Sequence, residues 1–181
     1  MVQRSGHRVT NLDEDREQSL SAFDRARENF EEAVRRAPDA ALRFLPPGED
    51  YALGGLVVHV TDVLKNYAGV LQEVHAADWQ QLTAPEHQTS PRDAALIRDG
   101  FDGGMRGRVM EEMRTAHSAL LEAVLLEPAE WYRRQAAVTY SGSSEPYPTS
   151  PADVVGWVRD HYDEHTLQIT ELVSQWAVAT R

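Results

Sequence analysis

Residues 150–176, SPADVVGWVRDHYDEHTLQITELVSQW, decide the fold. The stretch opens with strong signals for a helix start: Ser150 suits the N-cap, Pro151 suits the first helical position, and Asp153 places a carboxylate in the first turn. Apolar residues then recur at helical spacing, and His161 and His165 occupy consecutive turns of the same face. The apolar members of this face are Val154, Val158, Leu172 and Trp176, with Gln168 or Ile169 between them. The pattern predicts one long amphipathic helix whose histidine-bearing face packs inward.

Three further stretches show the same periodicity, at residues 19–37, 50–77 and 104–127. Pro38 ends the first and Pro128 ends the third, because proline cannot continue a helix. Four amphipathic helices of this length match the dimensions of a helix bundle. We therefore predict an all-α fold, a four-helix bundle with long loops between helices 2 and 3 and between helices 3 and 4.

Local signals refine the expected boundaries. Ser21 with Asp24 resembles a capping box, and Asp50 is a good N-cap for the second helix. Within the two long connections, residues 91–99 are expected to form a short helix and residues 136–140 a short extended piece. Such long loops at one end of a bundle can cover a site.

The length of 181 residues favours a single domain. We expect residues 19–181 to form this domain, and the polar residues 1–18 either to be flexible or to extend the first helix. The net charge of −11 disfavours nucleic acid and membrane surfaces as partners. The polar start has no signal-peptide pattern and no stretch could span a bilayer, so a cytoplasmic location is expected.

The histidines on the predicted core face need an explanation, because burying an imidazole without partners costs free energy. Side chains four residues apart lie close together on a helix, so His161 and His165 can converge on one metal ion. His59 supplies a natural third ligand, since it flanks the apolar stripe of the second helix between Leu56 and Val63. The alternative is three core histidines satisfied by hydrogen bonds, and for a cluster of three we favour a metal site.

Residues 161–165, HYDEH, also match the H-x-x-E-H signature of inverzincin proteases, in which the glutamate is the general base. Those enzymes draw a third ligand from a glutamate far downstream in a larger fold, and only 16 residues follow His165. The context therefore disfavours a protease. Glu164 is kept as a weak candidate for a catalytic proton shuttle, with a solvated position on the outer face as the simpler interpretation.

Asn66 and Trp157 project to the same sides as the expected ligands, and both are pocket candidates. Arg133 and Arg134, in the loop before the last helix, are candidates for contact with an anionic substrate, although most such pairs are solvated. The remaining histidines are expected at the surface or the edge of the core; they are His7, His75, His87 and His117.

The segment LGGLVVHVTDVLKNY at residues 53–67, together with HYDEHTLQI at residues 161–169, resembles the DinB/YfiT-like superfamily. The resemblance covers residues 19–176. It implies a four-helix bundle, often a homodimer, in which three histidines hold a divalent metal such as zinc or nickel. The family pattern places these ligands at His59, His161 and His165.

Relatives in that superfamily include thiol-dependent transferases and isomerases that use mycothiol or bacillithiol, among them the maleylpyruvate isomerase type. The resemblance therefore implies a metal-dependent enzyme, and we expect a thiol-dependent S-transferase or isomerase acting on a small electrophilic substrate. The chain contains no cysteine, so a low-molecular-weight thiol would have to supply the thiolate. The alternatives are a metal-dependent hydrolase or self-protection protein for a reactive metabolite, and a non-catalytic small-molecule-binding protein.

Overall fold

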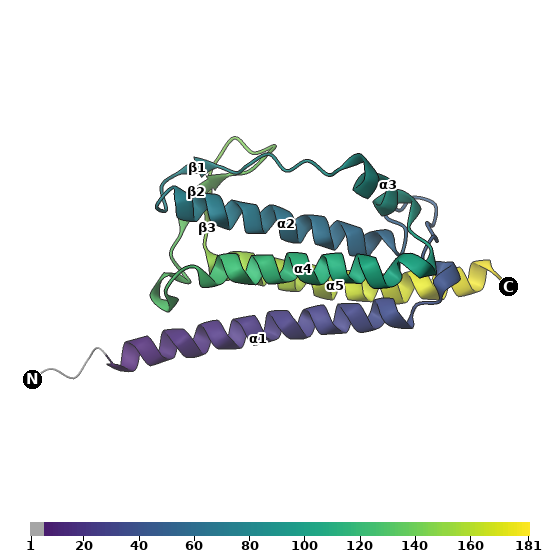
Figure 1. The fold of residues 1–181 in the computed structure, drawn as a ribbon, viewed down its shortest axis with the longest axis horizontal. Coiled ribbons are helices and arrows are strands. Elements are labelled where there is room, and N and C mark those ends of the chain that lie inside the picture. The colour runs from purple at the N-terminus through teal and green to yellow at the C-terminus, as the bar shows by residue number, and fades with distance from the viewer. Residues whose placement is uncertain (1–5) are drawn as a thin grey trace, which may run out of the picture.

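The computed structural model of the protein describes residues 6–181, with side chains described from Leu12 onward. Four long helices form a bundle in which α1 packs on α5 and α2 packs on α4 and α5 (Figure 1). The helices of the described residues are α1 Gly6–Arg36, α2 Gly55–Ala76, α3 Pro91–Asp99, α4 Arg106–Leu125 and α5 Pro151–Ala179. The all-α, four-helix-bundle prediction is confirmed.

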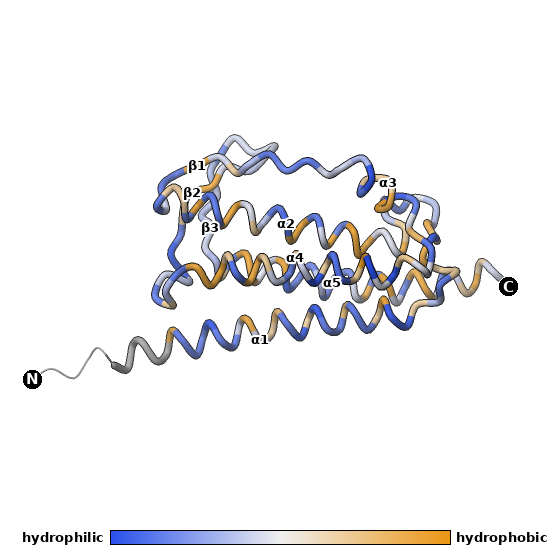
Figure 2. Tube along the Cα trace, viewed as in Figure 1, coloured by the Kyte–Doolittle hydropathy of each residue, from blue (hydrophilic) through white to orange (hydrophobic). Residues whose placement is uncertain are grey.

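The core runs along the bundle axis and is built from one face of each long helix. Hydrophobic positions recur in bands along the helices, with hydrophilic positions between them (Figure 2). The largest fully buried side chains include Phe23 and Phe30 of α1, Leu56 and Leu64 of α2, Met113 and Leu120 of α4, and Tyr162 and Ile169 of α5. Each such side chain contributes about 1.5–3 kcal/mol of burial free energy, so the apolar stripes hold the bundle together.

The start of α5 forms as its sequence predicts. Ser150 is the N-cap, and its Oγ accepts a hydrogen bond from the backbone N–H of Asp153 at 3.2 Å. In return, the Asp153 carboxylate accepts from the backbone N–H of Ser150 at 2.9 Å, which completes a capping box around Pro151. This cap sets where the helix that carries His161 and His165 begins.

The predicted capping box at Ser21 and Asp24 is wrong, because α1 begins at Gly6 and passes through these residues. The part of α1 before residue 19 contacts residues that are distant in the sequence, which the spacing of apolar residues cannot reveal. Arg133 donates to both carboxylate oxygens of Asp15 at 2.9 Å, and Arg16 donates to the Glu127 carbonyl at 3.3 Å. Residues 6–18 thus extend the first helix, and residues 1–5 lie outside the described part.

Asp50 is not the N-cap of α2, which begins at Gly55 with Gly54 before it. The backbone before the helix is tied instead to α3 and to an earlier part of the α1–α2 connection. The N–H groups of Ala52, Leu53 and Gly54 donate to the carbonyls of Ile97, Phe44 and Leu42. A Cβ on Gly55 would lie 1.9 Å from the Ile97 carbonyl oxygen, so this approach requires glycine.

The long connections carry the elements that were expected there. The short helix at residues 91–99 is α3, and the extended piece at residues 136–140 is β2, Ala136–Thr139. Two strands were not predicted: β1, Leu82–Thr83, pairs parallel with β2, and β3, Tyr147–Thr149, pairs antiparallel with it. The small sheet covers the end of α2 through Val70, Val74 and Val138 (Figure 1).

None of the described helices combines the length and the apolar character that a membrane span needs.

Candidate metal centre

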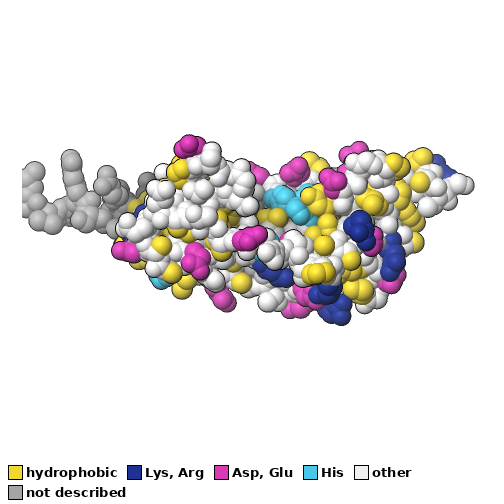
Figure 3. Space-filling view, turned by 90° about the horizontal axis from the view of Figure 1, so that it is seen from above, with side chains coloured by type: hydrophobic (Ala, Val, Ile, Leu, Met, Phe, Trp, Pro, Cys, Tyr) yellow, Lys and Arg dark blue, Asp and Glu magenta, His cyan; other side chains and the backbone are white. Residues whose placement is uncertain are grey.

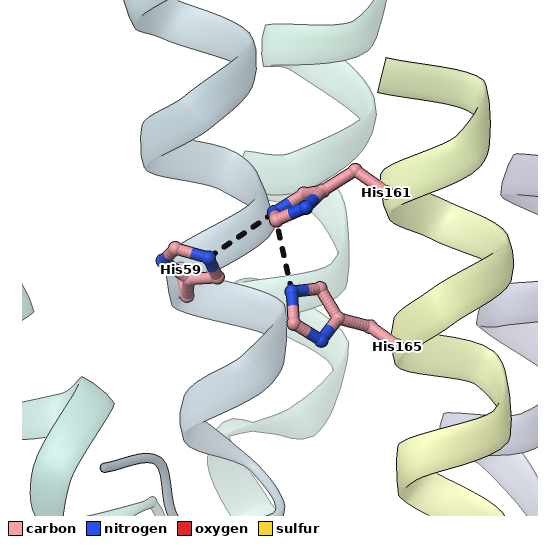
Figure 4. A group of neighbouring side chains, drawn as sticks. All are labelled: His59, His161 and His165. Carbon is pink, nitrogen blue, oxygen red and sulfur yellow. Dashed lines mark hydrogen bonds between the residues drawn. The ribbon is translucent and has the colours of Figure 1, made fainter. Parts of the chain in front are cut away.

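His59 of α2 and His161 and His165 of α5 meet in the contact between these two helices (Figure 4). The Nε2 atom of His161 lies 3.1 Å from Nε2 of His59 and 3.2 Å from Nε2 of His165. All three ligating nitrogens lie within 4.8 Å of one another. The structure therefore brings together the three residues predicted as metal ligands.

The separations of these nitrogens fit a single ion. Two nitrogens bound tetrahedrally to zinc at 2.0–2.1 Å lie about 3.3 to 3.4 Å apart, close to the two shortest separations here. Within the described residues the cluster contains three possible ligating side chains, which leaves a fourth position for an exogenous group. His59, His161 and His165 would hold the ion.

Local sequence explains why the rings converge. His161 and His165 are one turn apart on α5, between the buried Val158 and Ile169, so both face the neighbouring helix. His59 stands between the buried Val58 and Val60 on α2. Tyr162 faces the other way and packs against Phe23 and Phe30 of α1, so α5 buries one face on each neighbour.

The surroundings keep the imidazoles neutral. Burial, followed by the charges of the other two histidines, lowers the pKa of His59 to about 4. Burial and the neighbouring His165 lower the pKa of His161 to about 4 as well, and burial also lowers the pKa of His165. Neutral imidazoles offer free lone pairs at physiological pH, which metal binding requires.

The cluster is accessible from one side of the molecule. His59 and His161 are partly exposed, whereas His165 is only 5% exposed. Histidine side chains are visible near the middle of this surface, bordered by hydrophobic and acidic side chains (Figure 3). The ring of Tyr51 packs against His59, with ring centroids 4.5 Å apart. Solvent therefore reaches the cluster through His59 and His161 rather than through His165.

Trp157, a predicted pocket residue, belongs to an aromatic group one helical turn from His161. Its ring centroid lies 5.8 Å from that of Tyr67 on α2 and 5.8 Å from that of Tyr147 on β3, and Tyr140 lies 6.4 Å from Tyr67. The sequence indicated only Trp157 of this group, because its ring partners lie far away in the chain, Tyr67 on α2 and Tyr147 on β3. The two rings that contact Trp157 are tilted relative to it, with interplanar angles of 46° for Tyr67 and 57° for Tyr147.

The other predicted site residues are not part of the histidine cluster. Asn66 is partly buried on α2, and Glu164 is exposed on α5. The two arginines have partners other than the histidines: Arg133 pairs with Asp15, and Arg134 stacks over Trp131 with its guanidinium 4.3 Å from the ring centroid. The structure thus gives no support to an anion-binding role for this arginine pair.

The surface or core-edge expectation is wrong for His117, which is 3% exposed in the core. Its Nε2 lies 3.0 Å from an Asp24 carboxylate oxygen, its Nδ1 lies 3.3 Å from the Tyr162 hydroxyl, and its ring stacks on Phe23. The sequence could not show these partners, which come from two other helices. Of the other histidines, His75 pairs with Glu127 and His87 with Asp62, and the His7 side chain lies outside the described part.

A surface groove elsewhere does not include the cluster. It has a volume of about 730 Å³, lies between α1 and α5, and is lined by residues such as Ala33, Leu167 and Val173. None of the three convergent histidines lines it. The three convergent histidines therefore make the α2–α5 contact, rather than this groove, the candidate site.

Comparison with known families agrees with this geometry. The model of the DinB superfamily matches residues 22–169, which is most of the chain. This chain belongs to the DinB superfamily. The match spans all three histidines, and the family resemblance seen in the sequence is confirmed. A comparison with curated protein sequences gives no significant match.

Two solved structures share the fold of this DinB-superfamily chain. One is a histidine-to-alanine mutant of a mycothiol-dependent maleylpyruvate isomerase, with a TM-score of 0.61 and 9% identity, covering 84% of this chain. This chain spans 60% of that protein, which is less than two thirds. The other is a conserved protein from Enterococcus faecalis, with a TM-score of 0.59, 14% identity, and coverage of 87% of this chain and 94% of that one. At these identities the likeness shows the fold.

Proposed function

We propose that this protein is a divalent-metal-dependent enzyme that adds a low-molecular-weight thiol to a small electrophile. The observation that carries the proposal is the convergence of imidazole nitrogens from three histidines, His59, His161 and His165, within 4.8 Å of one another. Two of these side chains, His59 and His161, are partly exposed. Structural metal sites are closed by protein ligands, whereas catalytic sites keep one position open. Zinc and nickel both suit an all-imidazole site.

In this proposal the three histidines would bind the ion, and neighbouring aromatic residues would bind the substrate. A bound divalent ion supplies positive charge that favours the thiolate form of a thiol at neutral pH. His59, His161 and His165 hold their lone pairs toward one point, and Trp157 with Tyr67 offers a stacking surface beside it. The reaction forms one sulfur–carbon bond and leaves the thiol proton on the electrophile, so no oxidant or reductant is needed.

One further observation favours a thiol over water as the nucleophile. The chain has no cysteine, so the thiol would have to be an exogenous molecule. The fold is shared with a mycothiol-dependent isomerase, although the low identity limits that likeness to architecture. In an isomerase of this kind the thiol would add, allow rotation about a bond, and leave again.

The first experiment measures metal content by elemental analysis of the purified, untagged protein. We expect near-stoichiometric zinc or nickel in the parent, most of it lost in His161→Ala and all of it lost when His59, His161 and His165 are replaced together. His75→Ala is the matched control, because His75 is a half-exposed histidine paired with Glu127. Full metal occupancy in the triple variant would show that the ligand assignment is wrong.

The second experiment follows the consumption of mycothiol or bacillithiol by a panel of electrophiles, with metal-loaded parent and His161→Ala. We expect thiol-dependent turnover that the variant loses. Turnover of an electrophile without thiol would favour the hydrolase or self-protection alternative. Binding without turnover would favour the non-catalytic small-molecule-binding protein, and both of these results would overturn the thiol proposal.

A further inference from the structure

Two residues outside the three histidines form a hydrogen-bonded chain that ends on His165. The Nδ1 atom of His165 lies 2.7 Å from Oε1 of Gln168, one turn further along α5. The Nε2 amide group of Gln168 donates to the carboxylate of Glu49 at 3.2 Å. Glu49 belongs to the connection before α2, so these hydrogen bonds link α5 to the segment that leads into the helix of His59.

The chemistry of Glu49 determines the direction of both hydrogen bonds. An ionised carboxylate only accepts hydrogen bonds, so Gln168 must turn its NH₂ group toward Glu49. The carbonyl oxygen of Gln168 then faces His165, and an oxygen acceptor requires a proton on Nδ1. A neutral imidazole carries one N–H, so the lone pair of His165 must be on Nε2, the nitrogen that faces His161 and His59.

The same short connection contacts the cluster a second time. Tyr51, two residues after Glu49, packs on the His59 ring with centroids 4.5 Å apart and meets the edge of His165 at 6.2 Å. The segment is held by two hydrogen bonds within the same connection, from Leu53 to Phe44 and from Gly54 to Leu42. A third, from Ala52 to Ile97, ties it to α3. Glu49 and Tyr51 therefore lie on a connection anchored close to the cluster.

We propose that Glu49 and Gln168 are positioning residues that select the Nδ1–H tautomer of His165 and so prepare its Nε2 to bind the ion. The inference rests on the proposed metal site and extends it to two residues that touch neither metal nor substrate. A hydrogen bond to the outer nitrogen of a ligating histidine fixes its ring and increases its donor strength. Loss of such a partner typically weakens metal binding by about 10- to 100-fold.

The first test uses Gln168→Leu and two readouts. Two-bond ¹⁵N–¹H spectra of the metal-free protein, recorded above the ordinary histidine pKa, should show the Nδ1–H tautomer of His165 in the parent and a shift toward Nε2–H in the variant. Zinc affinity, measured by competition with a chelator, should fall about 10- to 100-fold. Gln175→Leu is the matched control, since Gln175 donates to Glu171 at 3.1 Å elsewhere on α5, and it should change neither readout.

The second test exchanges the two partners, and a role in packing alone would not produce its expected result. Gln168→Glu by itself keeps an acceptor for His165 but places a second carboxylate against Glu49, so zinc affinity should fall. The double variant E49Q/Q168E restores one donor and one acceptor in reverse order, and the affinity should return to within a few-fold of the parent. Failure of the exchange to rescue the affinity would overturn the proposal.

The readouts separate failure of the inference from failure of the metal site. A parent protein that binds no zinc but shows Nδ1–H on His165 would reject the metal proposal and leave the tautomer assignment standing. A parent that binds zinc, with unchanged affinity and an unchanged tautomer in Gln168→Leu, would reject the inference alone. An Nε2–H tautomer in the parent would also reject it.

Discussion

Acidification from about pH 7.5 to pH 5 should weaken zinc binding to this protein far less than it would with histidines of ordinary pKa, because protons compete weakly for its ligands. The sign follows from the structure: the pKa of His59 and of His161 is lowered to about 4, mainly by burial, so the folded protein favours the neutral, ligating form. At pH 5 a histidine with a pKa near 4 is about 10% protonated, which weakens binding by only about 1.1-fold for each ligand.

The alternative is a cluster whose histidines titrate as in water. Two ligands with the ordinary pKa of about 6.5 would together weaken binding about 1,000-fold at pH 5. Competition with a chelator of known proton affinity distinguishes these outcomes, and ¹H–¹³C spectra of the metal-free protein follow His59 and His161 directly. A loss of affinity above about 100-fold by pH 5, with both histidines titrating near 6.5, would refute the reasoning from burial.

Three other predictions test the fold, the substrate side of the site and the buried histidine. Gly55→Ala would place Cβ 1.9 Å from the Ile97 carbonyl oxygen and should cost about 1–3 kcal/mol or more in urea unfolding, because the atoms that Cβ meets are backbone atoms of α3. Gly156→Ala, with open space around its Cβ, should instead stabilise by about 0.5–1 kcal/mol, and equal effects would contradict the packing. Trp157→Ala should raise the KM for the electrophile several-fold and leave the metal content unchanged; a loss of metal would show instead that Trp157 supports the ion. Burial lowers the pKa of His117 despite its carboxylate partner, so its contribution to stability is present above the unfolded value near 6.5 and lost as the pH falls. His117→Gln should therefore lose less stability than the parent between about pH 7.5 and 5.5, and parallel curves would argue against a neutral buried His117.

The features that sequence alone could predict are those carried by neighbouring residues. The Ser150 cap with Pro151 and Asp153 predicted the start of α5, and periodicity placed His161 and His165 on one face. The structure shows both, because a helix cap and the spacing of four residues are local properties. His59 was identified as their partner from its place beside the stripe of α2 and from the family pattern, and the structure brings it to the other two.

The predicted starts of α1 and α2 were wrong because contacts outside each helix decide where it begins. Asp50 had the side chain of a good N-cap, but the backbone at Leu53 and Gly54 pairs with the carbonyls of Phe44 and Leu42 and delays the helix to Gly55. Ser21 with Asp24 resembled a cap but lies inside α1, since the preceding turns pack against the loop before α5. Local capping signals report what a residue can do, and tertiary contacts decide whether it does so.

Local sequence was enough to predict the helical class and the placement of His161 and His165 on one face of α5, and it shows that no cysteine is present to act as a ligand. Three features depend on contacts between distant segments: the mutual register of α2 and α5, the hydrogen bonds of Glu49 and Gln168 behind His165, and the burial of His117 against Asp24 and Tyr162. The physical reason is the range of the interactions. The helical period of 3.6 residues is fixed by the backbone, so neighbours in sequence share a face wherever the helix lies. Contacts between helices depend on how side chains interlock across the bundle, and that packing is a property of the whole core.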